Sequence, residues 1–284
     1  MRAKILPFII ILFLMPIFVY AQNYDNSLIN ELIIKSGMEK EIKQILFMIQ
    51  AGFDQSVQED KNLQKMPKET NLLIKDLAQK AFAPENLEEV IRMELRENLT
   101  GQDIKEVLIW LDSPLGKKCT QLEESADTPE AYAAKQQYAV QIKKSPPKAE
   151  RLNSLKNFDS AIKLTESSVE MTINTQIAIT MAIIATFPVE RQRSIDDITR
   201  EVEKNRSATT AAVKSEILVA LLYTYRSLTE AEIQQYIAFA RSPAGSKYHS
   251  ISMAAFRKAI YGGSVRWGKS IGEALQKRKS QSNA

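Results

Sequence analysis

The side chains best able to do chemistry in this chain are few and isolated. The 284 residues include one histidine, His249, and one cysteine, Cys119. Zinc and iron sites draw several ligands from His, Cys and carboxylates, and a Ser-His-Asp hydrolase needs a histidine beside its nucleophile. No Gly-x-Ser-x-Gly segment accompanies the histidine. We therefore expect His249 to be a surface residue, and we expect no metal, no cofactor and no catalytic site.

Cys119 has no partner for an intramolecular disulfide. A free cysteine behaves as a small hydrophobic residue, and the equivalent position of a second copy of its segment, described below, is Tyr248. We expect Cys119 to fill the core. A thiol that links two chains through a disulfide is the alternative.

Two pairs of acidic residues, Glu123-Glu124 and Asp196-Asp197, could act as the carboxylates of a glycosidase if the fold placed them across a cleft. Charged helix faces are the favoured interpretation, so a carboxylate-dependent hydrolase remains an alternative. Chance explains the two pairs with Ser-x-x-Lys spacing, since the chain is rich in both residue types. These are Ser145 with Lys148 and Ser160 with Lys163.

The most informative pattern occurs twice, with every match at the same offset and no gap. The first copy contains Thr100, Asp103, Trp110, Ser113, Pro114, Gly116 and Lys118. The second copy contains Thr229, Glu232, Phe239, Ser242, Pro243, Gly245 and Lys247. Such a repeat predicts an internal duplication, with two tandem copies of one unit.

Helical periodicity positions both copies. Apolar residues recur at i, i+3, i+4 and i+7, which predicts one buried stripe on each helix. The stripes are Ile104, Val107, Leu108 and Leu111, and Ile233, Tyr236, Ile237 and Ala240. A Thr-x-x-acid pair precedes each stripe and predicts a capping box at the first turn.

The Ser-Pro-x-Gly segment of each copy predicts a corner between two helices. Serine can cap the second helix, proline suits its first position, and glycine permits close packing. Only the lysines, Lys118 and Lys247, have no role in such a corner. An alternative is that each lysine and the amides of the helix start bind an anion.

The remaining chain has few glycines and the same helical period, so we expect an all-α protein. Helices are expected at 28–55, 85–98, 129–143, 155–187, 189–205 and 208–227, and a helix boundary at Gly262-Gly263. The prolines of 144–148 predict the joint between the units, 22–145 and 146–276. The basic residues 277–279 begin a polar tail, 277–284, that we expect to be disordered.

The amino terminus predicts export. Arg2 and Lys4 precede an apolar run at 5–20, and compact residues follow where signal peptidase cleaves. We expect removal of residues 1–21 between Ala21 and Gln22; an uncleaved membrane anchor is the alternative. Loss of Arg2 and Lys4 lowers the formal charge of +4 to near neutrality, which does not favour nucleic acid as a partner.

The most apolar segment of the mature chain is 171–187. We expect it to be a central core helix, because several polar residues would make a membrane position costly. Two alternatives are membrane insertion and a groove for an apolar ligand or lipid. Such a groove would be lined by Met171, Ile177, Met181 and Ile184.

The second copy, from Leu228 to Lys247, resembles the hallmark of the bacterial exported helical family called domain of unknown function 2059. The first copy is similar but departs at Gly101, Asp112 and Leu115. The resemblance implies an all-α protein of the Gram-negative envelope or periplasm, and it brings no established activity.

These observations predict an exported, periplasmic or secreted, non-enzymatic protein. We expect it to bind an unidentified protein or envelope component through a helix face or a groove between its two units. A carrier of an apolar molecule is the alternative.

Overall fold

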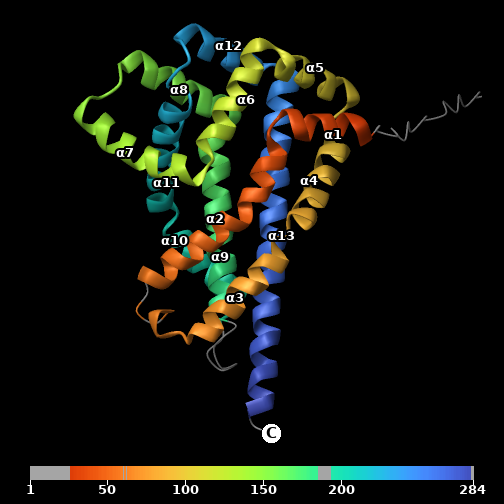
Figure 1. Ribbon diagram of the computed structural model, residues 1–284, viewed down its shortest axis with the longest axis vertical. Helices are drawn as coiled ribbons and strands as arrows, with labels where there is room; N and C mark the ends of the chain where they lie inside the picture. The colour runs from red at the N-terminus through yellow and green to blue at the C-terminus, as the bar shows by residue number, and fades with distance from the viewer. Residues whose placement is uncertain (1–25, 60, 62, 185–192, 283–284) are drawn as a thin grey trace, which may run out of the picture.

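The computed structural model describes residues 26–59, 61, 63–184 and 193–282. Within these ranges every regular element is a helix and none is a strand, which confirms the all-α prediction (Figure 1). The expected cleavage position at Ala21 and Gln22 lies outside the described residues. The helices are α1 (Asn26–Lys35), α2 (Met38–Glu59), the 3₁₀ turn η1 (Leu63–Lys65), α3 (Lys68–Ala81), α4 (Pro84–Asn98), α5 (Gly101–Asp112), α6 (Pro114–Ala126), α7 (Pro129–Lys144), α8 (Ala149–Ile162), α9 (Leu164–Ile184), α10 (Ile195–Lys204), α11 (Arg206–Thr224), α12 (Glu230–Arg241) and α13 (Pro243–Ser282).

The long helix α13 runs almost the whole length of the molecule and packs against α3, α4, α5 and α9 (Figure 1). The helix boundary expected at Gly262-Gly263 is wrong, because α13 continues through both glycines. A Cβ at Gly263 would lie 2.6 Å from the ring of Phe82, so this glycine permits close packing. One turn later, Trp267 Nε1 donates to the carbonyl oxygen of Ile74 at 2.8 Å and anchors α13 to α3.

The carboxyl end also differs from expectation. The tail expected to be disordered from residue 277 is helical to Ser282. Its lysine, arginine and glutamine residues favour helix, and positive charge is stabilising near a helix carboxyl terminus.

Two expected helices are each divided by one residue with a positive φ. Gly37, with φ of 81°, separates α1 from α2 within 28–55. Lys163 adopts a left-handed conformation, with φ of 55°, and separates α8 from α9 within 155–187. Helix α10 begins at Ile195, later than expected, after the capping residue Ser194. Gly37 could have indicated the first break from the sequence, because glycine readily adopts a positive φ. Lysine gives no such indication, so the break at Lys163 could not be predicted.

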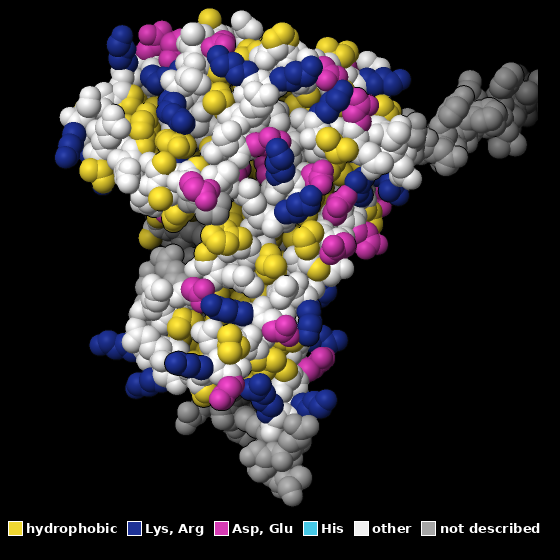
Figure 2. Space-filling view, in the orientation of Figure 1, with side chains coloured by type: hydrophobic (Ala, Val, Ile, Leu, Met, Phe, Trp, Pro, Cys, Tyr) yellow, Lys and Arg dark blue, Asp and Glu magenta, His cyan; other side chains and the backbone are white. Residues whose placement is uncertain are grey.

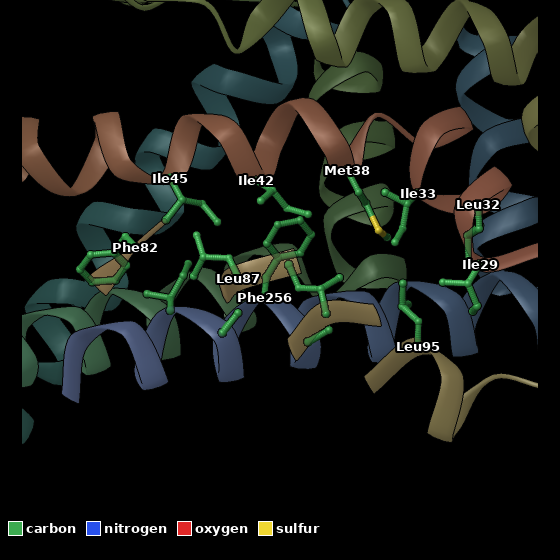
Figure 3. Packing of buried hydrophobic residues seen from close by; sticks show 14 of the residues in the cluster. Ile29, Leu32, Ile33, Met38, Ile42, Ile45, Phe82, Leu87, Leu95 and Phe256 are labelled. Carbon is green, nitrogen blue, oxygen red and sulfur yellow. The ribbon is translucent and has the colours of Figure 1, made fainter. Parts of the chain in front are cut away.

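The largest hydrophobic cluster lies between α1, α2, α4 and α13 (Figure 3). Ile42 and Ile45 project from α2 toward Leu87 of α4 and Phe256 of α13 (Figure 3). Helix α13 of the second expected unit therefore completes the core of the first unit. The boundary expected at residue 145 does not separate two independent cores.

The segment expected to be a core helix contributes its buried residues to a smaller, separate cluster. Ile173, Ile177 and Ile184 of α9 pack with Ile198 of α10 and Val213 of α11. Among the residues that the structure describes, no helix has the length and apolarity needed to cross a bilayer.

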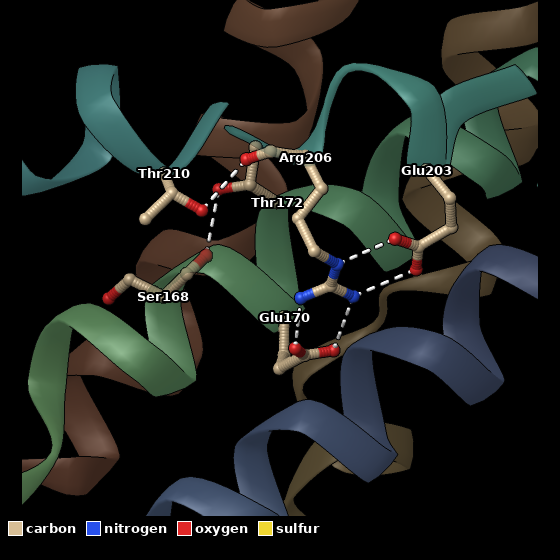
Figure 4. A network of polar contacts seen from close by, with 6 residues as sticks. All are labelled: Ser168, Glu170, Thr172, Glu203, Arg206 and Thr210. Atoms are coloured by element: carbon tan, nitrogen blue, oxygen red, sulfur yellow. Dashed lines mark hydrogen bonds and ion pairs between the residues drawn. The ribbon is translucent and has the colours of Figure 1, made fainter. Parts of the chain in front are cut away.

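An ion-pair network holds the start of α11 against α9 (Figure 4). Arg206 binds Glu170 of α9 at 2.5 Å and Glu203 of α10 at 2.6 Å. One guanidinium group therefore joins three helices, at the point where α10 turns into α11.

Candidate functional site

Both capping boxes predicted from the sequence are present. The hydroxyl of Thr100 accepts from the amide of Asp103 at 3.1 Å, and Asp103 accepts from the amide of Thr100 at 2.7 Å. Thr229 and Glu232 form the same pair of bonds at 3.2 and 2.7 Å. The four residues buried on α5, and the four on α12, are those of the predicted stripes.

Both Ser-Pro-x-Gly segments form the predicted corners. Ser113 Oγ accepts from the amide of Gly116 at 2.9 Å, and Ser242 Oγ accepts from that of Gly245 at 3.1 Å. A Cβ at either glycine would lie 2.0 Å from a carbonyl oxygen of the preceding helix. The glycines therefore permit the backbones of the two helices of each corner to approach each other closely.

Lys118 and Lys247, which have no role in the predicted corners, each bind a carboxylate of the opposite copy. Lys118 Nζ donates to Glu232 at 2.6 Å, and Lys247 Nζ donates to Asp103 at 2.6 Å. Each acid is the capping residue of the other copy. The pKa of Glu232 falls to about 2, chiefly because Lys118 and the amide of Thr229 donate to its carboxylate.

The aromatic residues of the two copies also meet. The rings of Trp110 and Phe239 stack with centroids 4.6 Å apart and planes 6° apart. The residues of the repeated motif therefore form one joint between the halves of the chain. The duplication itself stays a prediction.

The anion alternative finds no support at these corners. The lysine ammonium groups are held by Glu232 and Asp103, and serine hydroxyls occupy amides at the helix starts. We interpret the repeated motif as structural.

Cys119 is 1% exposed, which confirms it as a core residue. Burial raises the pKa of its thiol to about 12, so the thiolate needed for nucleophilic attack is disfavoured. Its burial also argues against a disulfide between two chains.

His249 was expected at the surface, but the structure leaves it only partly exposed. Its ring packs against the rings of Tyr236, Phe239 and Tyr248, with centroid distances of 6.3, 6.0 and 5.1 Å. Its Nε2 atom is buried without a hydrogen-bond partner. Tyr236 and Phe239 of α12 cover the face of α13 that carries His249. This contact between two helices could not be predicted from the periodicity of one helix.

The other candidates for chemistry lie apart. Asp196 is exposed, and Asp197 accepts a hydrogen bond at 2.7 Å from the hydroxyl of Ser194, the residue that caps α10. All four residues of the Ser-x-x-Lys pairs are exposed: Ser145, Lys148, Ser160 and Lys163.

A narrow acidic hollow lies where α2 meets α6. Four carboxylates line it: Glu41, Glu123, Glu124 and Asp127. Ser36, Gly37, Lys40 and Gln44 complete the wall. The sequence singled out Glu123-Glu124. Asp127 lies one helical turn after Glu123, whereas Glu41 joins them only because α2 lies beside α6, which the sequence did not indicate.

Glu123 is the carboxylate with the most specific surroundings. Its Oε1 accepts hydrogen bonds from the hydroxyls of Tyr225 at 2.6 Å and Tyr236 at 2.9 Å. Both tyrosines are buried, and burial raises their pKa values, so they remain protonated donors. Burial also raises the pKa of Glu123, although the two tyrosine hydrogen bonds oppose the rise.

The other acidic groups of the hollow repel one another. Loss of solvation raises the pKa of Asp127. It also raises the pKa of Glu41, and the charges of Asp127, Glu123 and Glu124 raise it further, even though Glu41 as a residue is solvent-exposed. Glu124 has a partner, Lys40, whose Nζ lies 2.5 Å from its carboxylate. The hollow therefore favours the protonated, neutral forms of Glu41, Glu123 and Asp127.

The hollow is too small for an organic substrate. It leaves only about 10 Å³ for a water-sized group, whereas ligand pockets measure some hundreds of Å³. Among the described residues, no group of three or more His, Cys, Asp or Glu is arranged to hold a metal ion.

A second, shallow depression of about 600 Å³ lies between α1 and α5. Its lining is Leu28, Glu31, Lys105, Leu108, Ile109, Asp112 and Ser113. Lys35 binds both Glu31 and Asp112 at 2.6 Å, so both acidic residues in the lining of the depression already have an ion-pair partner. The proposed apolar-ligand residues of α9 line neither depression.

Helix α2 carries exposed apolar side chains beside the acidic hollow. Phe47 and Met48 are each 56% exposed, one turn beyond Gln44 of the hollow wall. Hydrophobic side chains are visible over the middle of α2 in the space-filling view (Figure 2). We define the α2 face as Glu41, Gln44, Phe47 and Met48.

Comparison of this chain with protein-family models, with curated proteins and with solved structures found no match. The resemblance to domain of unknown function 2059 therefore stays a prediction, and the geometry of the α2 face is what bears on function.

Proposed function

We propose that this chain is an exported, non-enzymatic helical protein that binds another macromolecule through the α2 face. The observation that carries this proposal is the pair Phe47 and Met48. Large apolar side chains that lie next to one another and stay more than half exposed are typical of an interaction surface. A non-enzymatic role is supported by the small volume of the acidic hollow and by the buried, protonated state of the Cys119 thiol.

Export is supported by the sequence of the first 21 residues and by the resemblance of 228–247 to an exported family. Mass spectrometry of the protein purified from its own cells tests this part. A mature chain that begins at Gln22 is expected, and a chain that retains Met1 would contradict export.

Site-specific photocrosslinking tests the binding surface. A photoreactive residue is placed at Met48 in the full chain, and the control carries it at Leu72 of α3, which is 66% exposed. We expect a discrete adduct in the native cells from position 48 alone. No adduct, or equal adducts from both positions, would overturn the proposal.

A further inference from the structure

Helix α7 differs from the other α-helices in how it is attached to the fold. It lies at the outer edge of the molecule and packs on α6 and α11 (Figure 1). Within the described part of the chain, each of the other α-helices has a side chain that makes a hydrogen bond or ion pair to a different helix, whereas α7 has none. Apolar packing alone therefore holds α7 in place.

This packing is slight. Of the α7 side chains that the structure describes, Ala131 alone is buried, at 6% exposed. Tyr138 and Ile142 are partly buried where they pack against the hydrophobic cluster of α6, α8, α11 and α12. Tyr132, on another side of the helix, is 63% exposed. A segment with so few buried contacts opens at a much lower free energy than the whole fold.

The next helix, α8, has a similar length and is held far more firmly. It buries Ser154, Leu155 and Phe158. The guanidinium group of Arg151 binds Glu230 of α12 at 2.9 Å. Opening of α8 would therefore expose core residues and break an ion pair, whereas opening of α7 breaks no side-chain hydrogen bond to another helix.

Prolines separate α7 from both of its neighbours in sequence. Pro129 is its first residue, and Pro146-Pro147 follows its last turn. Because proline has no amide hydrogen to donate, the backbone hydrogen bonds of α7 do not continue into α6 or α8. Movement of α7 therefore leaves the backbone hydrogen bonds of both neighbouring helices intact.

We propose that α7 is a displaceable helix that leaves α6 and α11 while the rest of the fold stays intact. The open form uncovers the apolar surface on which Tyr138 and Ile142 pack, so the position of α7 controls access to that surface. This inference goes beyond the proposed function and does not depend on the α2 face.

Amide hydrogen exchange of the mature full chain, followed by mass spectrometry, tests the proposal. After correction for intrinsic exchange rates, we expect peptides from α7 to exchange about a hundredfold faster than peptides from α8. Similar protection of the two helices would overturn the proposal.

Limited proteolysis with trypsin gives a second readout, because a helix must open locally before it is cut. Lys135 lies within α7 and is half-buried, whereas Lys156 lies within α8 and is exposed. We expect cleavage after Lys135 to precede cleavage after Lys156. The opposite order, which side-chain exposure alone favours, would contradict the proposal.

Two tyrosine substitutions in α7 locate the contact that holds it. Tyr138→Ala removes the ring that lies 5.7 Å from the ring of Tyr223 of α11, and Tyr132→Ala makes the same change on the exposed side. We expect Tyr138→Ala to speed exchange of α7 about tenfold and Tyr132→Ala to leave it unchanged. Circular dichroism confirms that both variants fold. Equal effects of the two substitutions, or an equal increase in exchange throughout α13, would overturn the proposal.

Discussion

His249 is a titratable group in a site that solvates its charged form poorly. Three aromatic rings surround it, and burial lowers its pKa to about 4. In the unfolded chain its pKa is near 6.5, so acidification protonates the unfolded state first. Its contribution to stability is therefore present above pH 6.5 and is lost as the pH falls toward 4.

The substitution His249→Phe removes this titration and the unpaired Nε2 atom. We expect the free energy of unfolding to rise by about 1 kcal/mol at neutral pH, because an unsatisfied buried nitrogen is costly. The gain should increase between pH 6.5 and 4. Urea unfolding at pH 7.5 and pH 5 measures both effects, and an identical pH dependence in the variant would contradict them.

At the scale of helices, each corner depends on a glycine, because there is no room for a side chain at that position. A methyl group at Gly245 would meet the carbonyl oxygen of Phe239 at 2.0 Å, and neither backbone segment can move without breaking the corner. We expect Gly245→Ala to destabilise the protein by about 3 kcal/mol, as overpacking does in a tight interior.

The matched control is Gly52→Ala in the middle of α2, where nothing lies within 4 Å of the new methyl group. This change should stabilise the protein by about 1 kcal/mol through helix propensity. Thermal unfolding compares the two variants. Equal effects would show that the corner tolerates a side chain.

Local chemistry explains what the sequence could predict at this scale. Capping pairs, corner serines and buried stripes act within one or two helical turns, so Thr100 with Asp103 and Ile104 to Leu111 were predictable. Contacts between distant segments were not. The partners of Lys118, the packing around His249 and the meeting of Glu41 with Glu123 depend on how α2, α6, α12 and α13 assemble.

At the scale of the whole molecule, the halves of the chain share one core. Trp267 and Ile271 of α13 are buried in the same cluster as Ile29 and Ile91, on the other side of residue 145. A fragment that ends at Ser145 lacks this helix and exposes apolar surface that α13 covers.

We expect the fragment 22–145 to be unfolded or aggregated, and the full mature chain to unfold in one cooperative transition. Circular dichroism and calorimetry test both statements. A fragment with a sharp thermal transition of its own would show that the first unit folds independently.

Ion pairs cross the joint in both directions. Lys118 reaches Glu232 while Lys247 reaches Asp103, and tryptophan stacks on phenylalanine between them. Reciprocal contacts of this form are what a symmetric homodimer makes about its two-fold axis. The predicted duplication would account for this reciprocity, because a chain with a single copy would hold a lysine, an acid and an aromatic ring to offer to a second copy of itself. Because both motifs lie in one chain, their association does not depend on protein concentration.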